Sequence, residues 1–144
     1  MRRLIRVSAD LDAESLLRRT GERVTPARRR ILALLLASPT ALSQQELLHA
    51  LADGPAIDRV TVYRVLEWLS EKGLAHKIAG EDRIWRFNAA SHRIHQHAHF
   101  QCQRCQRVYC LEHIQIDWQP QLPDGFRLHH ADITLKGDCP SCSR

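Results

Sequence analysis

The first apolar pattern of the chain predicts a helix that begins near Thr25. The Thr25 hydroxyl can accept hydrogen bonds from free backbone amides, and Pro26 suits the first position of a helix. The apolar residues that follow at i, i+4, i+7 and i+8 share one helix face: Ala27, Ile31, Leu34 and Leu35. We expect this helix to end before Pro39. A weaker amphipathic pattern over residues 11–19 predicts another helix ahead of it.

Two more helices are predicted in the residues that follow. Ser43 and Glu46 have the spacing of a capping box, in which each side chain hydrogen-bonds the backbone amide of the other residue. Asp58 is a suitable N-cap for a longer helix, which Gly73 would end. The apolar positions of this longer helix also fall on one face, which we expect to be buried: Val62, Val65, Leu66 and Leu69.

After Gly73 the pattern changes from helical spacing to short runs typical of strands. Residues Ala75–Ala79 and Arg83–Asn88 are such runs, and the residues Gly80–Asp82 between them favour a turn, so we expect a β-hairpin. Several helices followed by a hairpin is the element order of a winged helix-turn-helix module. In that module the helix predicted over residues 58–72 takes the place of the recognition helix.

The polar face of this predicted recognition helix carries residues suited to DNA. The residues left on the outside, once the apolar stripe faces the core, are Arg59, Thr61, Tyr63 and Arg64. Arginine contacts phosphates or guanine, while threonine and tyrosine can reach phosphates or a thymine methyl. Arg28 lies in the first turn of the helix that begins near Thr25, and we expect it to contact phosphate because helix N-termini favour anions. A solvated helix face is the alternative explanation of this pattern.

Composition divides the 144-residue chain into two parts. The net charge is +5, and residues 1–90 hold 15 Lys/Arg against 11 Asp/Glu, so the first part is basic. All five cysteines and eight of the nine histidines lie at or beyond His76. An odd cysteine count without a visible secretory signal argues against a secreted disulfide-bonded protein, and we expect a cytoplasmic one. The longest apolar run, Ile31–Ala37, is too short to span a membrane.

Two C-x₂-C pairs predict a structural zinc site. Cys102 and Cys105 form the first pair, and Cys139 and Cys142 form the second. Each pair can direct two thiolates at one ion, and two pairs complete the tetrahedral four-sulfur shell that Zn²⁺ prefers. A redox role is the alternative, but no βαβ pattern surrounds either pair. In so small a domain, bound zinc would contribute directly to folding.

A second group of possible metal ligands lies on both sides of the first cysteine pair. His95, His97 and His99 alternate as residues on one face of a strand do. Cys110 lies on the predicted return strand, residues 107–110, and can therefore lie beside these histidines. Three imidazoles and one thiolate would form a second metal site, whose soft sulfur favours Zn²⁺ over Fe²⁺ or Mn²⁺. A solvated histidine-rich strand is the alternative.

Several short motifs that occur in one order give the chain a family resemblance. They are RVTPAR at Arg23–Arg28, TVYRVL at Thr61–Leu66, GLAH at Gly73–His76, a His-x-His before the first C-x₂-C, and the second C-x₂-C. In this combination the chain resembles the bacterial ferric uptake regulator family of metal-sensing repressors over residues 11–142. The resemblance implies an α+β fold, with a winged helix-turn-helix domain in residues 1–88. It also implies an α/β dimerisation domain with a structural four-cysteine zinc site in residues 89–144.

The family resemblance also implies the partners of the chain. It implies a homodimer that, when loaded with metal, binds double-stranded operator DNA, typically an AT-rich palindrome. A zinc enzyme is the distant alternative, and it is disfavoured because the sequence has no H-E-x-x-H or comparable carboxylate-bearing motif. We therefore expect a transcription regulator and not an enzyme.

Within the family, the chain most resembles the zinc uptake regulator branch. The main regulatory site of the family takes two histidines that match His97 and His99, and an acidic residue whose position here is occupied by Cys110. The zinc-sensing branch adds a histidine just after the recognition helix, which matches His76. Some members of the branch add another, which matches His95.

One departure from the family pattern concerns iron sensing. A histidine that iron and peroxide sensors often supply from the N-terminal domain aligns with Ser38. The resemblance therefore implies a regulatory zinc site of His76, Cys110 and two of the three histidines His95, His97 and His99. It also implies that the chain is a repressor that controls zinc uptake genes. An iron- or peroxide-responsive regulator on the same scaffold is the alternative.

Overall fold

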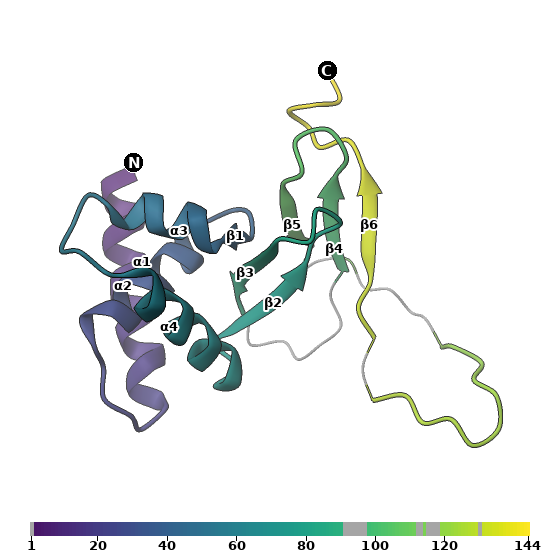
Figure 1. Cartoon of the computed structure of the whole chain (residues 1–144), viewed down its shortest axis with the longest axis horizontal. Coiled ribbons are helices and arrows are strands. Elements are labelled where there is room, and N and C mark those ends of the chain that lie inside the picture. Colours follow the sequence, from purple (N-terminus) through teal and green to yellow (C-terminus); the bar gives the residue numbers. More distant parts are fainter. Residues whose placement is uncertain (1, 91–97, 112–113, 115–118, 130) are drawn as a thin grey trace.

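The computed structural model describes residues 2–90, 98–111, 114, 119–129 and 131–144 of the chain. Within them the helices are α1 (Arg2–Arg19), α2 (Pro26–Ala37), α3 (Gln44–Leu51) and α4 (Arg59–Glu71). The strands are β1 (Leu42–Ser43), β2 (Ala75–Ala79), β3 (Trp85–Ala89), β4 (Ala98–Cys102), β5 (Val108–Leu111) and β6 (Thr134–Gly137). The helices lie on one side of the molecule, and two three-stranded sheets follow them (Figure 1). None of these helices is both long and apolar enough to cross a membrane.

Side-chain caps start three helices at the residues that the sequence predicts. Thr25 and Asp58 each accept a hydrogen bond from an amide in the first turn of the helix that follows, α2 and α4 respectively. Ser43 and Glu46 form the complete capping box at the start of α3. Helix α1 differs from the prediction, because it begins at Arg2 and not near residue 11. No glycine or proline interrupts the chain ahead of residue 11, so the helix continues toward the N-terminus.

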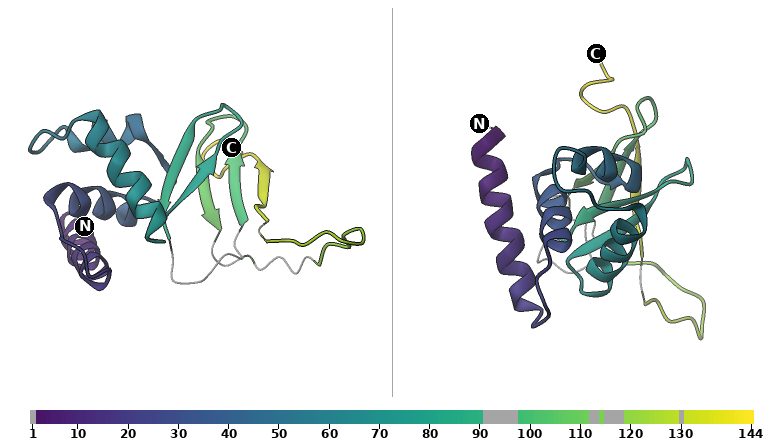
Figure 2. Two further views of the ribbon diagram at one scale, coloured as in Figure 1. Left: turned by 60° about the horizontal axis from the view of Figure 1, so that its bottom comes forward. Right: turned by 60° about the vertical axis from the view of Figure 1, so that its left-hand side comes forward.

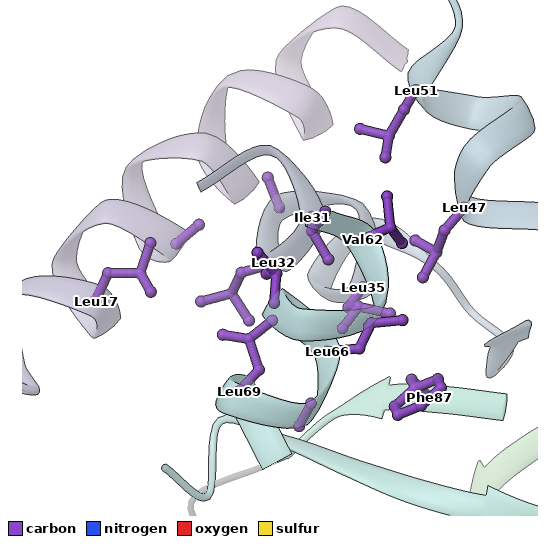
Figure 3. Close-up of a cluster of buried hydrophobic side chains, with 14 of the residues drawn as sticks. Leu17, Ile31, Leu32, Leu35, Leu47, Leu51, Val62, Leu66, Leu69 and Phe87 are labelled. Carbon is purple, nitrogen blue, oxygen red and sulfur yellow. The ribbon is translucent and has the colours of Figure 1, made fainter. Parts of the chain in front are cut away.

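The four helices and β3 enclose one apolar core (Figure 3). Its fully or almost fully buried side chains come from every helix: Leu17, Ile31, Leu32, Leu35, Leu47, Leu51, Val62, Leu66, Leu69 and Phe87. Leu32 lies outside the predicted stripe of α2 and is nevertheless buried, because α1 packs along α2 from the outside (Figure 2). Burying each such side chain stabilises the fold by about 1.5–3 kcal/mol. This core therefore holds α4 in a fixed position.

The sheet beside the helices has the strand order β1–β3–β2 and contains the predicted hairpin. Strands β2 and β3 are antiparallel, as predicted. Strand β3 begins at Trp85 and not at Arg83, since Arg83 has a φ of 61° and belongs to the turn. It also continues to Ala89, past the predicted end at Asn88. Strand β1 is an addition to the predicted hairpin, since two residues are too few to show an alternating pattern.

The second sheet has the strand order β5–β4–β6, with β4 in the centre. Strand β5 is antiparallel to β4 and agrees with the predicted return strand to within one residue. Strand β6 is parallel to β4 and was not predicted. The described residues 119–129 form an irregular segment that extends away from the sheet before β6 (Figure 1). The order of helices, hairpin and second sheet confirms the predicted α+β fold.

An ion pair within the β2–β3 hairpin holds its turn. The Arg86 side chain is 10% exposed and donates hydrogen bonds of 2.9 and 2.6 Å to the two carboxylate oxygens of Asp82. The bonds from Arg86, helped by one from the Ile84 amide, outweigh burial and lower the pKa of Asp82 to about 2. The same guanidinium and carboxylate leave no room for a side chain at Gly80, where a Cβ would collide with both.

We predict that Asp82→Asn lowers the free energy of unfolding by about 1–2 kcal/mol at neutral pH, because it removes a charge-assisted, partly shielded pair. The folded pKa of Asp82 lies below its ordinary value of 3.8. The ionised carboxylate therefore stabilises the fold fully above about pH 4, and this stabilisation is lost as the pH falls toward about 2. Urea unfolding followed by far-ultraviolet circular dichroism would show the difference between variant and wild type narrowing over that interval.

The control for this prediction is Glu14→Gln on α1. It removes a pair with Arg18 whose side chains are 36% and 72% exposed, so the unfolding free energy should change by less than about 0.5 kcal/mol. Equal losses of stability in the two variants would contradict the special role of the hairpin pair.

Candidate metal centres and nucleic-acid interface

The parallel pairing of β4 with β6 brings the two cysteine pairs together. Cys102, the last residue of β4, is paired in register with Gly137, the last residue of β6. Parallel neighbouring strands end at the same edge of a sheet, so the turns that carry Cys105, Cys139 and Cys142 meet at that edge. The backbone amide of Cys139 donates a hydrogen bond of 3.3 Å to the sulfur of Cys102.

The distances within this four-cysteine cluster fit a zinc ion. The four sulfur atoms all lie within 4.8 Å of one another, and those of Cys105 and Cys139 are 3.7 Å apart. A tetrahedral ion with Zn–S bonds of about 2.3 Å separates its sulfurs by about 3.8 Å. All four cysteines are free thiols, so each can serve as a ligand. The predicted structural ligands are therefore all brought together.

The charges of the four thiols also favour a bound cation. Backbone amides of Cys105 and Cys139 donate to the sulfur of Cys102 and lower its pKa to about 6. The pKa of Cys142 is raised to about 12, first because its thiol is hydrogen-bonded to Cys139. Without a cation the cluster thus retains at least one proton at neutral pH, and a cation would allow all four thiols to ionise. Tyr109, which sequence reasoning missed, is also hydrogen-bonded to Cys139, and this contact raises the pKa of the phenol.

A second cluster joins the two sheets. It consists of His76 on β2, His99 on β4 and Cys110 on β5, whose ligand atoms all lie within 4.8 Å of one another. His99 and Cys110 are direct partners in the antiparallel register of β4 and β5. The Nε2 atoms of His76 and His99 are 3.0 Å apart, and their ring centroids are 5.1 Å apart. We call these three residues the interdomain cluster.

The interdomain cluster contains three of the predicted regulatory ligands, while His95 and His97 lie outside the described residues. Two imidazole nitrogens and one thiolate are donors that Zn²⁺ commonly takes. Nitrogens bound to a tetrahedral zinc at about 2.0–2.1 Å are separated by about 3.3 Å, which is close to the observed separation of His76 and His99. His99 is only 6% exposed, so an ion here would be shielded from water on that side.

Helix α4 presents three of the predicted DNA-contacting residues to solvent. Arg59, Tyr63 and Arg64 are all exposed, and Tyr63 keeps 53% of its surface accessible. Thr61 has a different role, because its hydroxyl donates a hydrogen bond of 2.6 Å to the carboxylate of the N-cap residue Asp58. The exposed face of α4 therefore combines two guanidinium groups with one phenol, which suits contact with phosphates and base edges.

Arg28 is held by contacts within the protein. Its guanidinium lies 3.6 Å from the ring centroid of Trp68, and it donates a hydrogen bond of 2.8 Å to the carbonyl of Arg23. The Trp68 indole in turn donates a hydrogen bond of 2.9 Å to the carboxylate of Glu22. These contacts tie the α1–α2 turn to α4. The phosphate contact expected of Arg28 stays a prediction.

Solved structures share this fold. A zinc uptake regulator complexed with zinc and DNA is 26% identical to this chain, with a TM-score of 0.68 over 96% of this chain and 95% of that one. The ferric uptake regulator Fur of Helicobacter pylori is 19% identical, with a TM-score of 0.67 over 92% of this chain and 94% of that one. These similarities confirm the predicted winged helix-turn-helix domain followed by a dimerisation domain.

Sequence comparisons identify the family. The peroxide-responsive repressor PerR of Staphylococcus saprophyticus is 30% identical over 135 residues, which cover 91% of this chain and 89% of that protein. The model of the ferric uptake regulator family matches residues 19–136. Members of that family are metal-responsive transcription regulators and not enzymes, as the sequence predicts. The chain therefore belongs to the ferric uptake regulator family.

Proposed function

We propose that this chain is a zinc-responsive transcriptional repressor that binds operator DNA as a homodimer and controls zinc uptake genes. The observation that carries the proposal is the interdomain cluster, because its three residues come from both sheets. Zn²⁺ bound by His76, His99 and Cys110 would supply coordinate bonds between the two sheets. The four-cysteine cluster would hold a second, structural zinc ion.

The position of His76 couples the interdomain cluster to α4. Strand β2 follows α4 after Gly73 and packs against it, so the placement of His76 is tied to that of α4. In a homodimer, two recognition helices must reach successive major grooves, which are about 34–36 Å apart. Bonds from Zn²⁺ to the interdomain cluster would favour one orientation of β2 relative to β4 and β5, and therefore one placement of α4. They would shift the population of molecules toward the form that binds DNA.

Cys110 supports zinc as the regulatory metal. A thiolate is a soft ligand that suits Zn²⁺ better than Fe²⁺ or Mn²⁺, whereas a carboxylate at the same position would suit the harder ions. The similarity to the zinc uptake regulator complexed with zinc and DNA also supports this choice. Regulatory ligands His95 and His97 remain part of the proposal, as candidates for completing the coordination shell.

Exposed apolar residues support the proposed homodimer. They lie in the segment before β6 and on β6 itself: Leu122, Phe126, Leu128 and Leu135. Strand β6 forms an edge of its sheet, and exposed edges with apolar side chains are typical of surfaces that pair with another chain. A two-fold dimer matches a palindromic operator. We propose that this operator is AT-rich, as the family resemblance implies, and that the repressor acts in the cytoplasm.

A peroxide-responsive regulator is the second candidate function. The 30% identity to the peroxide-responsive repressor of Staphylococcus saprophyticus favours it. Titration of metal-depleted protein with Zn²⁺, Fe²⁺ and Mn²⁺ separates the two, with binding to a DNA fragment selected from a random library as the readout. If the chain senses zinc, Zn²⁺ should induce DNA binding at a lower free concentration than Fe²⁺ or Mn²⁺ does. Added peroxide should then leave DNA binding unchanged. Peroxide sensing predicts an iron-loaded form that peroxide releases from DNA.

We predict that Cys110→Ser weakens Zn²⁺-dependent DNA binding by about tenfold or more, because the hydroxyl replaces the soft ligand of the interdomain cluster. Fluorescence anisotropy of labelled DNA at buffered Zn²⁺ concentrations measures the effect. Cys110→Asp is the matched variant, since its carboxylate should restore metal dependence while shifting the preference toward Fe²⁺ or Mn²⁺. A Cys110→Ser variant that responds to Zn²⁺ like the wild type would rule out this ligand set.

We predict that Cys102→Ser unfolds the C-terminal sheet and prevents dimerisation, because structural zinc contributes directly to the folding of a small domain. Sedimentation and elemental analysis should show a monomer that has lost about one zinc ion per chain. Cys110→Ser removes a thiol outside the four-cysteine cluster and should remain a zinc-containing dimer. A stable dimer of Cys102→Ser would show that the four-cysteine cluster is not structural.

We predict that Arg64→Ala weakens DNA binding by about 1–3 kcal/mol if Arg64 contacts a base. If Arg64 binds a phosphate instead, the slope of log binding constant against log salt concentration should fall by about one. Binding measured at several salt concentrations and on altered sequences distinguishes the two roles. Arg144→Ala removes the same charge from an exposed residue at the end of the chain. If Arg64→Ala has no larger effect than Arg144→Ala, α4 does not use this residue.

A further inference from the structure

Each residue of the interdomain cluster has a neighbour on the same strand that also lies between the two sheets. Side chains two positions apart on a strand point to the same face. The neighbours are Ile78 beside His76 on β2, Gln101 beside His99 on β4, and Val108 beside Cys110 on β5. All three neighbours are buried, with exposed fractions of 6%, 2% and 1% respectively. The cluster thus lies next to a set of contacts that contain no metal ligand.

The apolar part of these contacts joins the helical module to β5. Ile78 and Val108 form a small buried cluster with Ala41, which precedes β1. The backbone amide of Ala41 donates a hydrogen bond of 2.8 Å to the carbonyl of Val108. A backbone hydrogen bond within an apolar, buried environment is costly to break, because both groups would have to be left unsatisfied or exposed to water.

The polar part centres on Gln101. Its side-chain oxygen accepts a hydrogen bond of 3.3 Å from the backbone amide of Glu81 in the hairpin turn. Its side-chain nitrogen donates a hydrogen bond of 3.0 Å to Gln106. The carboxylate of Glu81 also forms an ion pair with Lys136 on β6. Gln101 therefore links the hairpin to the turn between β4 and β5, and its buried polar groups are both satisfied.

We propose that these contacts, which we call the seam (Ala41, Ile78, Glu81, Gln101, Val108 and Lys136), position His76 against His99 and Cys110 before any metal binds. Gln101 thereby acts as a positioning residue for the regulatory site. The inference rests on the proposed function, because it takes the interdomain cluster as the regulatory metal site. It adds that the seam, which holds no ligand, sets the affinity of that site for metal.

The size of the effect follows from a population argument. The apparent dissociation constant of a ligand equals its intrinsic value divided by the fraction of protein in the binding-competent arrangement. If loss of the Gln101 contacts leaves about a tenth of the molecules with the two sheets correctly placed, the metal binds about tenfold more weakly. The four-cysteine cluster lies at one end of the C-terminal sheet and takes no ligand from β2 or β3, so its affinity for zinc should not change.

The first test asks whether the seam forms without regulatory metal. Hydrogen exchange of the Ala41 amide is measured in the full chain with its structural zinc retained and the interdomain cluster emptied by a mild chelator. The amide should exchange at least about tenfold more slowly than an unprotected amide, because it is bonded to Val108. Exchange at the unprotected rate until Zn²⁺ is added back would overturn the proposal.

The second test measures metal affinity in Gln101→Ala by competition between the protein and a chromophoric chelator for Zn²⁺. We expect binding at the interdomain cluster to weaken about tenfold while one structural zinc per chain is retained. Gln103→Ala is the matched control, because Gln103 is an exposed glutamine of the turn that follows β4. Equal affinities of Gln101→Ala and wild type would overturn the proposal.

A third pair of variants decides the matter if Gln101→Ala loses its structural zinc. Glu81→Lys places a second positive charge beside Lys136. Both positions are half-exposed, so the fold should survive this repulsion. The interdomain cluster should then bind Zn²⁺ about two- to fivefold more weakly. Combining it with Lys136→Glu should restore the affinity. An unchanged affinity in Glu81→Lys, or no recovery in the double variant, counts against the seam.

The proposed function and the seam fail in different ways. His76→Ala measured alongside removes a ligand of the interdomain cluster itself. If wild type and His76→Ala bind the same amount of Zn²⁺ equally tightly, the proposed regulatory site is wrong and the seam inference falls with it. If His76→Ala loses one zinc ion while every seam variant binds like the wild type, only the seam inference is overturned.

Discussion

The hydrogen bonding of β4 along both of its edges is the constraint on which the two candidate metal sites depend. Its antiparallel pairing with β5 sets His99 opposite Cys110. Its parallel pairing with β6 sets Cys102 level with Gly137 and so brings the two cysteine turns to one edge. The alternation of side chains along the same strand also places Gln101 beside His99. One strand therefore positions residues of the structural cluster, the interdomain cluster and the contacts that hold the sheets together.

The two clusters differ in the way that the protein supports them. The four-cysteine cluster lies at one end of a single sheet, and its thiols cannot all ionise until a cation balances their charge, as the opposite pKa shifts of Cys102 and Cys142 indicate. Such a site stabilises the domain that contains it. The interdomain cluster draws its ligands from two sheets, so occupying it has a consequence for the relative placement of those sheets. A structural role suits the first arrangement, and a regulatory role suits the second.

The helical module transmits that placement because its parts are tightly held. The leucine-rich core fixes α4 against α2 and β3, and the Arg28–Trp68 contact ties α4 to the turn before α2. The Arg86–Asp82 pair stiffens the hairpin that carries His76. The exposed face of α4 carries Arg59, Tyr63 and Arg64. In the proposed function, a change in the placement of β2 would therefore change the placement of α4, because the two elements pack against each other.

Features that depend on local chemistry could be predicted from the amino-acid sequence alone. Caps at Thr25, Ser43 and Asp58 start helices because a side chain and an amide a few residues away suffice to form them, and the spacing of the cysteine pairs indicates a shared ion. The parallel pairing of β4 with β6, the placement of Arg28 on Trp68 and the contacts of Gln101 became visible only in the folded chain. Each of these depends on partners distant in the chain, and a short strand or a single glutamine has no periodic pattern that reveals its partner. The local code therefore specified the elements and their candidate ligands, while long-range packing decided which of them meet.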